Sequence, residues 1–373
     1  MPSESEFAHS RNPFEPAYRV LTDAISSCVF PGCAFGVLAG GRIVLQDALG
    51  HFTYDPDAPA VLASTVYDIA SVTKVAATTA AAMLLHQRGQ LDLQTPLGEL
   101  LPDFLENRGA GEPARKVRLC HLLAHNSGLP GYVEFFRTAA TAQELMRALL
   151  NLRLEAEPGV RAEYSDPGFM LLGKALETLM KEPLSGWVKR EIFLPLGMAD
   201  TGFCPSPSAR NSIPPTEDDT WLRHRRIQGE VQDENAWLLG GVAGHAGLFS
   251  NVPDLLRFAG EILAAGRLAG RTPLFTANTV ELFAQRQGPA GNSMALGWDT
   301  PSEISSSGQY FSPRTIGHLG FSGCSLWIDL EAEIAVALLT NRTWPERSAT
   351  TAQSIRQIRP SFHNAVRKAL KSI

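Results

Sequence analysis

Strand-forming patterns lie near both ends of this chain of 373 residues, and the interval between them is mostly helical in pattern. Residues 34–39 and 42–49 are largely apolar runs joined by Gly40-Gly41, a combination typical of a β-hairpin. Residues 314–341 indicate paired strands, rich in β-branched and large apolar side chains. The hairpin and these strands need each other to bury their faces. We therefore expect an α+β fold, in which one antiparallel sheet flanked by helices is built from both chain ends around an inserted, mostly helical region.

The chain is longer than one ordinary domain and shows no internal repeat, so we expect either a single large catalytic unit, residues 1–373, or two intimately packed regions. Within it we expect a sheet region, 15–70 together with 310–373, and a mostly helical region, 71–309. The clearest helical patterns lie at 141–150, 184–193, 253–263 and from residue 351 onward, and the predicted loops are 205–215 and 302–312.

Ser71 and Lys74 are the residues that most constrain the chemistry. They stand three apart at the start of an Ala-rich helical run, 75–86, so their side chains share one face and can meet. The free N–H groups of a helix start favour a developing alkoxide, and burial would lower the pKa of Lys74 toward that of a useful base. Taken alone the pattern is weak, because serine at a helix start is usually a cap and lysine there is usually solvated.

A second polar group, Tyr164-Ser165-Asp166, precedes the apolar run 169–173 and is therefore predicted to lie in a turn before a helix. A purely structural explanation is equally good at this point. Ser165 or Asp166 would cap the helix, with Pro167 at its first position.

The third element is the run from His318 to Gly323, which leads into the apolar stretch 324–330. A second stretch, 334–340, follows after a turn, and the two indicate paired strands. The three elements are S-x-x-K, a tyrosine trio and a basic-x-Gly strand. They occur in the same order as in the known S-x-x-K hydrolases.

In these motifs the chain resembles the serine β-lactamase and penicillin-binding-protein family. The resemblance is strongest to the branch that holds class C β-lactamases, D-alanyl-D-alanine peptidases and family VIII carboxylesterases, and it spans roughly residues 15–370. It implies a β-lactamase-like fold, with Ser71 as nucleophile, Lys74 as its base and Tyr164 as proton shuttle. Further stretches that resemble the family are 117–130, 195–201, 244–250 and 296–298.

The same resemblance assigns the residues that contact the substrate. His318 and Gly320 would stand on the strand that faces it, with His318 as part of the catalytic group. The backbone N–H groups of Ser71 and Phe321 would form the oxyanion hole.

Two positions depart from the usual family pattern and bear on the substrate. Asp166 stands where the family usually has Asn, and an ionised Asp can only accept hydrogen bonds, which disfavours contact with a substrate carbonyl. His318 replaces the lysine usual in β-lactamases, and an unperturbed histidine would anchor a substrate carboxylate only below about pH 6.5. We expect a serine hydrolase that cleaves a carboxylic ester, a β-lactam or a D-amino-acid amide through an acyl-enzyme. The departures favour esters and small strained amides.

Other functions stay open. A D-alanyl-D-alanine carboxypeptidase, or a non-hydrolytic penicillin-binding sensor or scaffold, would share the fold. A zinc site on His121 and His125 would lack the glutamate of the H-E-x-x-H motif, and we predict no metal and no cofactor. The glycine-rich segment 240–247 lacks the Lys-Ser/Thr of a phosphate loop. We expect it to form a turn near the cleft, with His245 among the substrate-binding residues.

The resemblance implies a small-molecule ester or amide as the partner, and composition argues against other kinds. The net charge of −5 and the pI near 6.0 argue against nucleic acid, and no stretch approaches the roughly 20 apolar residues of a membrane span. Residues 1–10 lack the apolar core of a signal peptide, so we expect a cytoplasmic protein, or a periplasmic one if a leader was removed. The 5 cysteines show no C-x-x-C spacing, which favours reduced thiols. The oligomeric state is not predicted.

Overall fold

The main sheet joins strands from the two ends of the chain. The computed structural model describes residues 12–265, 273–289 and 291–372. Its five antiparallel strands follow the order β2-β1-β10-β9-β8, and in the β1–β10 pair Cys33 lies opposite Thr340. The expected sheet from both chain ends is thereby confirmed. The strands are β1 (Gly32–Ala39), β2 (Arg42–Gly50), β8 (Thr315–Leu319), β9 (Ser325–Asp329) and β10 (Ile334–Thr340).

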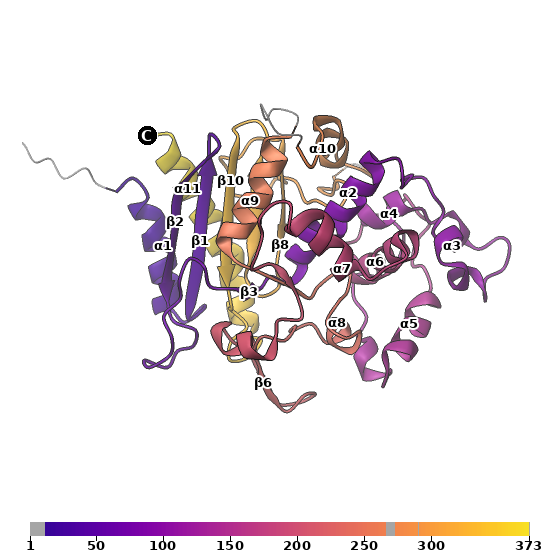
Figure 1. The fold of residues 1–373 in the computed structure, drawn as a ribbon, viewed down its shortest axis with the longest axis horizontal. Helices are drawn as coiled ribbons and strands as arrows, with labels where there is room; N and C mark the ends of the chain where they lie inside the picture. Colours follow the sequence, from indigo (N-terminus) through magenta and orange to yellow (C-terminus); the bar gives the residue numbers. More distant parts are fainter. Residues whose placement is uncertain (1–11, 266–272, 290, 373) are drawn as a thin grey trace, which may run out of the picture.

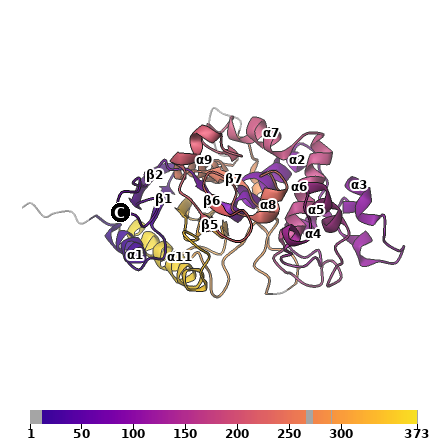
Figure 2. The ribbon, with the colours of Figure 1, turned by 90° about the horizontal axis from the view of Figure 1, so that it is seen from below.

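Helices cover both faces of the sheet, as Figure 2 shows. Side chains along β10 alternate between the faces. Val336 and Leu338 pack with α1 and α11, whereas Ala335 and Ala337 join the larger core on the side of α9. A strand buried on both faces needs an unbroken apolar run, and residues 334–339 supply one. These helices are α1 (Glu15–Ser26), α9 (Val252–Leu263) and α11 (Ala349–Leu370).

Most other helices gather beyond β8, on the right in Figure 1. Those expected at 141–150 and 184–193 are present, although the second ends as a π-helical turn. In the described part of the chain, no helix is long and apolar enough to cross a membrane. These α-helices are α2 (Ala80–Gln87), α3 (Leu97–Leu100), α4 (Leu119–Leu123), α5 (Ala142–Leu150), α6 (Asp166–Met180), α7 (Leu184–Val188), α8 (Glu234–Leu238) and α10 (Ala277–Ala284).

Short strands lead the chain into the region around Ser71. Strand β7 pairs with both β3 and β4. Strand β3 ends three positions before Ser71. The small strands are β3 (Tyr67–Asp68), β4 (Gly202–Phe203), β5 (Glu217–Asp219), β6 (Arg225–Ile227) and β7 (Leu248–Ser250). Short 3-10 or π-helical turns are η1 (Ala70–Val72), η2 (Lys74–Thr79), η3 (Pro102–Leu105), η4 (Pro113–Lys116), η5 (Phe135–Arg137), η6 (Lys189–Phe193) and η7 (Pro207–Ser212).

Helix α9 lies so close to β1 that Gly36 has no room for a side chain. A Cβ atom at Gly36 would lie 2.6 Å from Val252 Cγ1 and 2.9 Å from Leu256 Cδ1. Gly260 stands on the helix side of the same contact, and a Cβ there would meet only Leu38 Cδ2, at 3.7 Å. Packing therefore requires the glycine of the strand but not the glycine of the helix.

Replacing each glycine by alanine tests this contact. Gly36→Ala is expected to lower the free energy of unfolding by about 1–3 kcal/mol, because the added methyl overpacks the interface. Gly260→Ala is expected to raise it by about 0.5–1 kcal/mol, because alanine favours a helix. Urea unfolding followed by circular dichroism measures both. Equal effects of the two substitutions would show that α9 does not press on β1 at Gly36.

Candidate active site

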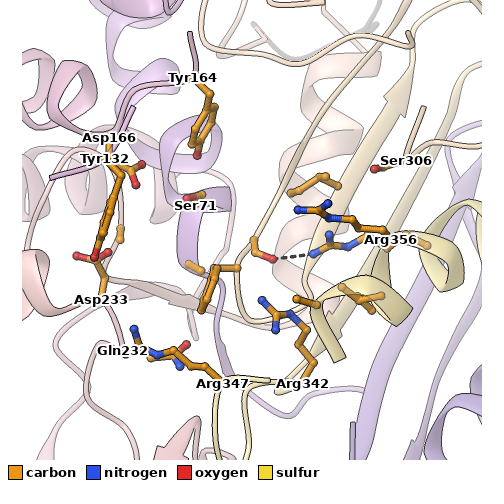
Figure 3. A pocket seen from close by; sticks show the side chains of 18 of the residues that line it. Ser71, Tyr132, Tyr164, Asp166, Gln232, Asp233, Ser306, Arg342, Arg347 and Arg356 are labelled. Carbon is orange, nitrogen blue, oxygen red and sulfur yellow. Dashed lines mark hydrogen bonds between the residues drawn. The ribbon is translucent and has the colours of Figure 1, made fainter. Parts of the chain in front are cut away.

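A cavity of about 890 Å³ opens where the end of β8 faces the helical region. Its lining includes five residues named from the sequence, Ser71, Tyr164, Asp166, Gly320 and Phe321. Figure 3 shows the labelled side chains of Ser71, Tyr164 and Asp166 together in one part of it. The fold therefore brings together residues from three separate parts of the chain.

Ser71 lies in a tight turn between β3 and a long helical segment. The segment begins as the 3-10 turn η1, continues as the π-helical turn η2, and becomes α-helical at Ala80. The expected helix start at Ser71 is confirmed, although its first turns are not α-helical. Ala70, just before the serine, has a φ of +47°, a left-handed conformation that costs energy for any residue with a side chain.

Asp68 holds this strained turn in place. Its Oδ1 accepts a hydrogen bond from Ala70 N, and its Oδ2 accepts one from Gln232 N, both at 2.8 Å. Burial raises the pKa of Asp68 to about 6, although the two backbone N–H groups favour its ionised form. Asp68 is thus a positioning residue for Ser71. Its role was not predicted from the sequence, where its only signal was a carboxylate three residues before the serine.

Lys74 is fully buried, and its ammonium group has three acceptors. Nζ donates to Asp166 Oδ1 at 2.6 Å, to Ser71 Oγ at 3.0 Å and to the backbone oxygen of His245 at 3.1 Å. These contacts use all three N–H bonds of a protonated lysine. Burial lowers the pKa of Lys74, but the Asp166 carboxylate outweighs burial and the net pKa is raised. The expected meeting of Ser71 and Lys74 is confirmed. The expectation of a lowered net pKa for Lys74 is wrong, because Asp166 outweighs the effect of burial.

Tyr164 packs between Lys74 and a buried histidine. Lys74 Nζ lies 4.8 Å from the centre of the tyrosine ring, and the ring stacks on His125 with centroids 4.6 Å apart. His125 Nδ1 in turn accepts a hydrogen bond from Ser165 N at 2.9 Å, which fixes the turn that carries the tyrosine. Burial raises the pKa of Tyr164, and the charge of Lys74 offsets only part of that effect. The phenol is therefore protonated at neutral pH.

Structural and chemical explanations of the tyrosine trio hold at the same time. Ser165 caps helix α6, because its Oγ accepts a hydrogen bond from Gly168 N at 3.0 Å. Asp166, the first residue of that helix, turns toward Lys74 and keeps 16% of its side chain exposed. Its Oδ1 is occupied by the ammonium, so the first effect of Asp166 is on the lysine rather than on a substrate.

His318 does not titrate in the range that we expected. Its side chain is buried on β8, and its Nδ1 donates to the backbone oxygen of Leu319 at 2.8 Å. Burial lowers the pKa of His318 to about 3, and the charge of Lys74 acts in the same direction. A neutral imidazole cannot attract a carboxylate by charge, so the predicted pH-dependent anchor is wrong. The ring instead lies beside Tyr164, with centroids 5.8 Å apart.

The end of β8 is pressed against the segment that precedes Ser71. A Cβ atom at Gly320 would lie 2.6 Å from the backbone oxygen of Ile69, so only glycine fits there. This approach places Phe321 at the same cavity wall as Ser71. Among the described residues, neither Ser71 N–H nor Phe321 N–H donates to a backbone acceptor. Two unused backbone donors at one wall are what an oxyanion hole requires.

His245 acts behind the cavity rather than in its lining, contrary to expectation. Its side chain is 1% exposed, and its Nε2 lies 2.9 Å from Asp233 Oδ1. Burial disfavours the charge of Asp233, but His245, the backbone N–H of Ala236 and the charge of Lys74 together lower the pKa of Asp233 to about 2. Asp233 itself lines the cavity and was missed from the sequence. The glycine-rich turn serves close packing, since a Cβ at Gly244 would lie 2.1 Å from the backbone oxygen of Phe169.

The pair considered as zinc ligands is used in backbone contacts. His121 Nδ1 accepts a hydrogen bond from Arg118 N at the start of α4, and that helix ends at Leu123, before His125. Residues 12–265, 273–289 and 291–372 contain no group of three His, Cys, Asp or Glu side chains placed to hold a metal ion.

Comparison with known proteins places this geometry in a family. The family model named Beta-lactamase matches residues 19–359. The chain belongs to the beta-lactamase family. It is 32% identical over 348 residues to a putative D-alanyl-D-alanine carboxypeptidase of Salmonella agona, a match that covers 84% of this chain and 79% of the relative. A putative D-alanyl-D-alanine carboxypeptidase of Salmonella typhi is 30% identical over 349 residues, with the same shares covered. As a member of this family, the protein is a serine hydrolase.

Solved structures of low sequence identity share the fold. EstCE1, described as a hydrolase with promiscuous acyltransferase activity, superposes with a TM-score of 0.73 at 23% identity, over 94% of this chain and 98% of that one. Unliganded simvastatin synthase (LovD) of Aspergillus terreus gives 0.70 at 20% identity, over 95% and 98%. The octameric penicillin-binding protein homologue of Pyrococcus abyssi gives 0.69 at 21% identity, over 87% and 72%. The expected β-lactamase-like fold is thereby confirmed.

Asp68→Asn tests the positioning of Ser71. An asparagine can accept from only one of the two backbone N–H groups and turns an NH₂ group toward the other, so the turn at Ala70 should relax. We expect kcat for an ester substrate to fall about tenfold or more, with the circular dichroism spectrum unchanged. The exposed Asp23→Asn is the control and should keep full activity. An unchanged kcat in Asp68→Asn would remove Asp68 from this role.

Proposed function

We propose that the protein hydrolyses small carboxylic esters or strained amides through an acyl-enzyme on Ser71. The observation that carries this proposal is the contact of Ser71 Oγ with Lys74 Nζ at 3.0 Å, at the wall that also holds the unused N–H groups of Ser71 and Phe321. A nucleophile, a base and donors for an oxyanion are the parts that acyl transfer needs.

The acylation step follows from the contacts of these residues. Ser71 Oγ forms a bond to the substrate carbonyl carbon, and the carbonyl oxygen, now negative, accepts from the N–H groups of Ser71 and Phe321. The serine proton passes to Lys74. Tyr164 relays a proton to the leaving group as the bond between that group and the carbonyl carbon breaks. Water then attacks the carbonyl carbon of the acyl-enzyme and gives a proton to Tyr164 or Lys74. That proton passes to Ser71 Oγ as its bond to the carbonyl carbon breaks, which releases the acid and restores the serine.

Protonation of Lys74 limits this step in the free enzyme. A lysine that donates three hydrogen bonds has no lone pair with which to take the serine proton. Only the deprotonated fraction can act as a base, and that fraction is small at neutral pH because Asp166 raises the pKa of Lys74. We therefore expect kcat/KM to rise with pH on the alkaline side.

The choice of substrate rests on Asp166, which stands where the family usually has Asn. Asp166 offers no N–H to the carbonyl of a peptide or β-lactam side chain, and one of its oxygens is occupied by Lys74. These facts favour esters and strained amides. The relatives named as putative D-alanyl-D-alanine carboxypeptidases favour a D-peptide as the alternative substrate. Values of kcat/KM for para-nitrophenyl esters, nitrocefin and D-alanyl peptides decide between them.

Ser71→Ala is the first test of the mechanism. Loss of the nucleophile is expected to lower kcat by several orders of magnitude on every substrate that the parent protein turns over. A fluorophosphonate should add one adduct to the parent protein, on the peptide that holds Ser71, as seen by mass spectrometry. Retention of more than about a hundredth of kcat in the variant would contradict the role of Ser71. Release of no more than one product per protein molecule would instead indicate a sensor that stays acylated.

Asp166→Asn tests the control of Lys74. Removing the carboxylate leaves burial as the main influence on Lys74, so its pKa should fall below the ordinary value of 10.5. The rise of kcat/KM with pH should then move to lower pH, with a gain of about tenfold in ester hydrolysis near neutral pH for each pKa unit lost. Glu134→Gln is the matched control, because Glu134 also lines the cavity but bonds to Arg137. Its pH profile should match that of the parent.

Asp166→Asn should also lower the stability of the folded protein, by an amount that depends on pH. The pKa of Lys74 is raised in the folded protein, so the ion pair stabilises fully below pH 10.5 and is lost as pH rises through the folded value. Asp166→Asn should therefore lower the unfolding midpoint most at neutral pH. A pH profile of kcat/KM identical to that of the parent would show that Asp166 does not set the protonation of Lys74.

A further inference from the structure

One arginine binds the turn between β8 and β9, which carries the Phe321 N–H. Arg359 belongs to helix α11 and is 5% exposed. Its Nη2 donates to the backbone oxygens of Gly320 at 2.6 Å and Cys324 at 2.8 Å, and its Nε donates to that of Gly323 at 3.1 Å. Three of the five N–H bonds of a guanidinium are therefore used within this one turn.

The turn also closes with backbone hydrogen bonds of its own. Gly320 N donates to Cys324 O at 2.7 Å, and Gly323 N donates to Gly320 O at 3.0 Å. Arg359 thus adds a second, charged donor to two oxygens that already have a partner. A buried cation is costly to the folded protein, so this arrangement calls for a role beyond closing the turn.

The oxygen of Gly320 and the N–H of Phe321 belong to the same peptide group. That peptide is trans, so its C=O and N–H lie in one plane and point in opposite directions. Because the C=O points toward Arg359, the N–H points away from that side chain. Among the described residues it donates to no backbone acceptor. Holding the carbonyl therefore fixes the direction of a free donor.

The same turn is joined to the segment that precedes Ser71. Ser322 Oγ donates to the backbone oxygen of Asp68 at 2.9 Å, and a Cβ atom at Gly320 would lie 2.6 Å from the backbone oxygen of Ile69. The two N–H groups of the oxyanion hole thus stand on segments that contact each other. A shift of the turn would change the distance between them.

The charge of Arg359 adds to this effect on direction. Burial lowers the pKa of Arg359 to about 10, so the guanidinium is still protonated at neutral pH. A hydrogen bond from a cation to a peptide oxygen polarises the peptide and makes its N–H a stronger donor. The gain is largest when that N–H meets a full negative charge, as it does in the transition state of acyl transfer.

We propose that Arg359 is a positioning residue of the oxyanion hole, which aims and strengthens the Phe321 N–H through the carbonyl of Gly320. Its three donated hydrogen bonds end on the protein backbone, so it acts through Phe321 rather than on the substrate. The role rests on the proposed function, in which the negative oxygen accepts from the Phe321 N–H.

Two substitutions test the effect on turnover. Arg359→Gln removes the charge, whereas Arg359→Lys keeps the charge but loses the fork that reaches three oxygens. Loss of a whole oxyanion donor typically lowers kcat by about a hundredfold to a thousandfold, and an effect exerted through that donor should be smaller. We expect kcat for a para-nitrophenyl ester to fall about tenfold to a hundredfold in Arg359→Gln and less in Arg359→Lys, with KM within about threefold of the parent. An unchanged kcat, or a change in KM alone, would overturn the proposal.

Arg367→Gln is the matched control. Arg367 is also a buried arginine of α11, 8% exposed, and its Nε donates to the backbone oxygen of Tyr310 at 3.1 Å, outside the turn. Both glutamine variants should unfold at lower urea concentration, because each leaves a buried backbone oxygen with one donor fewer. Only Arg359→Gln should lose kcat. Equal losses of kcat in the two variants would indicate a general effect of α11 packing and would contradict the proposal.

The amide of Phe321 gives a readout that does not depend on turnover. In protein labelled with ¹⁵N-phenylalanine, its resonance is the one missing from the spectrum of Phe321→Leu. A hydrogen bond to the preceding carbonyl deshields an amide nitrogen, because it polarises the peptide. The Phe321 nitrogen should therefore move upfield in Arg359→Gln, move less in Arg359→Lys, and stay in place in Arg367→Gln.

The two kinds of measurement separate this proposal from the proposed function. An unmoved Phe321 resonance in Arg359→Gln would overturn the link between the arginine and the N–H. A parent protein that hydrolyses no ester, with the shift still present, would fault the proposed reaction and not that link. Should Arg359→Gln fail to fold, Arg359→Lys supplies both the kinetic and the spectroscopic result.

Discussion

The buried ammonium of Lys74 is the interaction on which the site depends. Lys74 is fully buried, and its ammonium group donates to Ser71, to the first residue of α6 and to the backbone of the glycine-rich turn. A buried charge is costly unless it is completely bonded, so these segments must be in place at the same time. The helical region is therefore held to the nucleophile by charge as well as by apolar packing. The same bonds keep the base protonated until a substrate or a higher pH changes the balance.

Local sequence patterns were enough to predict the main sheet and the contact between Ser71 and Lys74. The hairpin follows from Gly40-Gly41 between apolar runs, and the meeting of Ser71 with Lys74 follows from a spacing of three on a helix. The two chain ends join in one sheet because the N-terminal hairpin and the C-terminal strands each need a partner to bury their apolar faces. The sequence did not decide whether Ser165 caps α6 or belongs to an active-site turn, because both roles use the same residue types.

Properties set by distant residues could not be predicted. Asp166 stands 92 positions from Lys74, and no spacing tells whether burial or this partner controls the lysine pKa. His318 looked like a titrating group, but its environment depends on Lys74 and the packing around β8. Asp68 gave little signal in the sequence, because it acts through two backbone N–H groups. The roles and protonation states of these side chains require a three-dimensional structure, because the sequence does not tell which donors and acceptors surround a buried group.

The pairing of Cys33 with Thr340 also fixes an order of events during synthesis. A ribosome makes the nucleophile and its base before it makes β10, because Ser71 and Lys74 precede that strand in the chain. Until then β1 lacks its neighbour, and its apolar faces stay exposed to chaperones and to other chains. A nascent chain that stops before β8 would carry Ser71 and Lys74 but not the N–H group of Phe321. The cavity is therefore complete only when the segments from β8 onward join the residues that precede them in the chain.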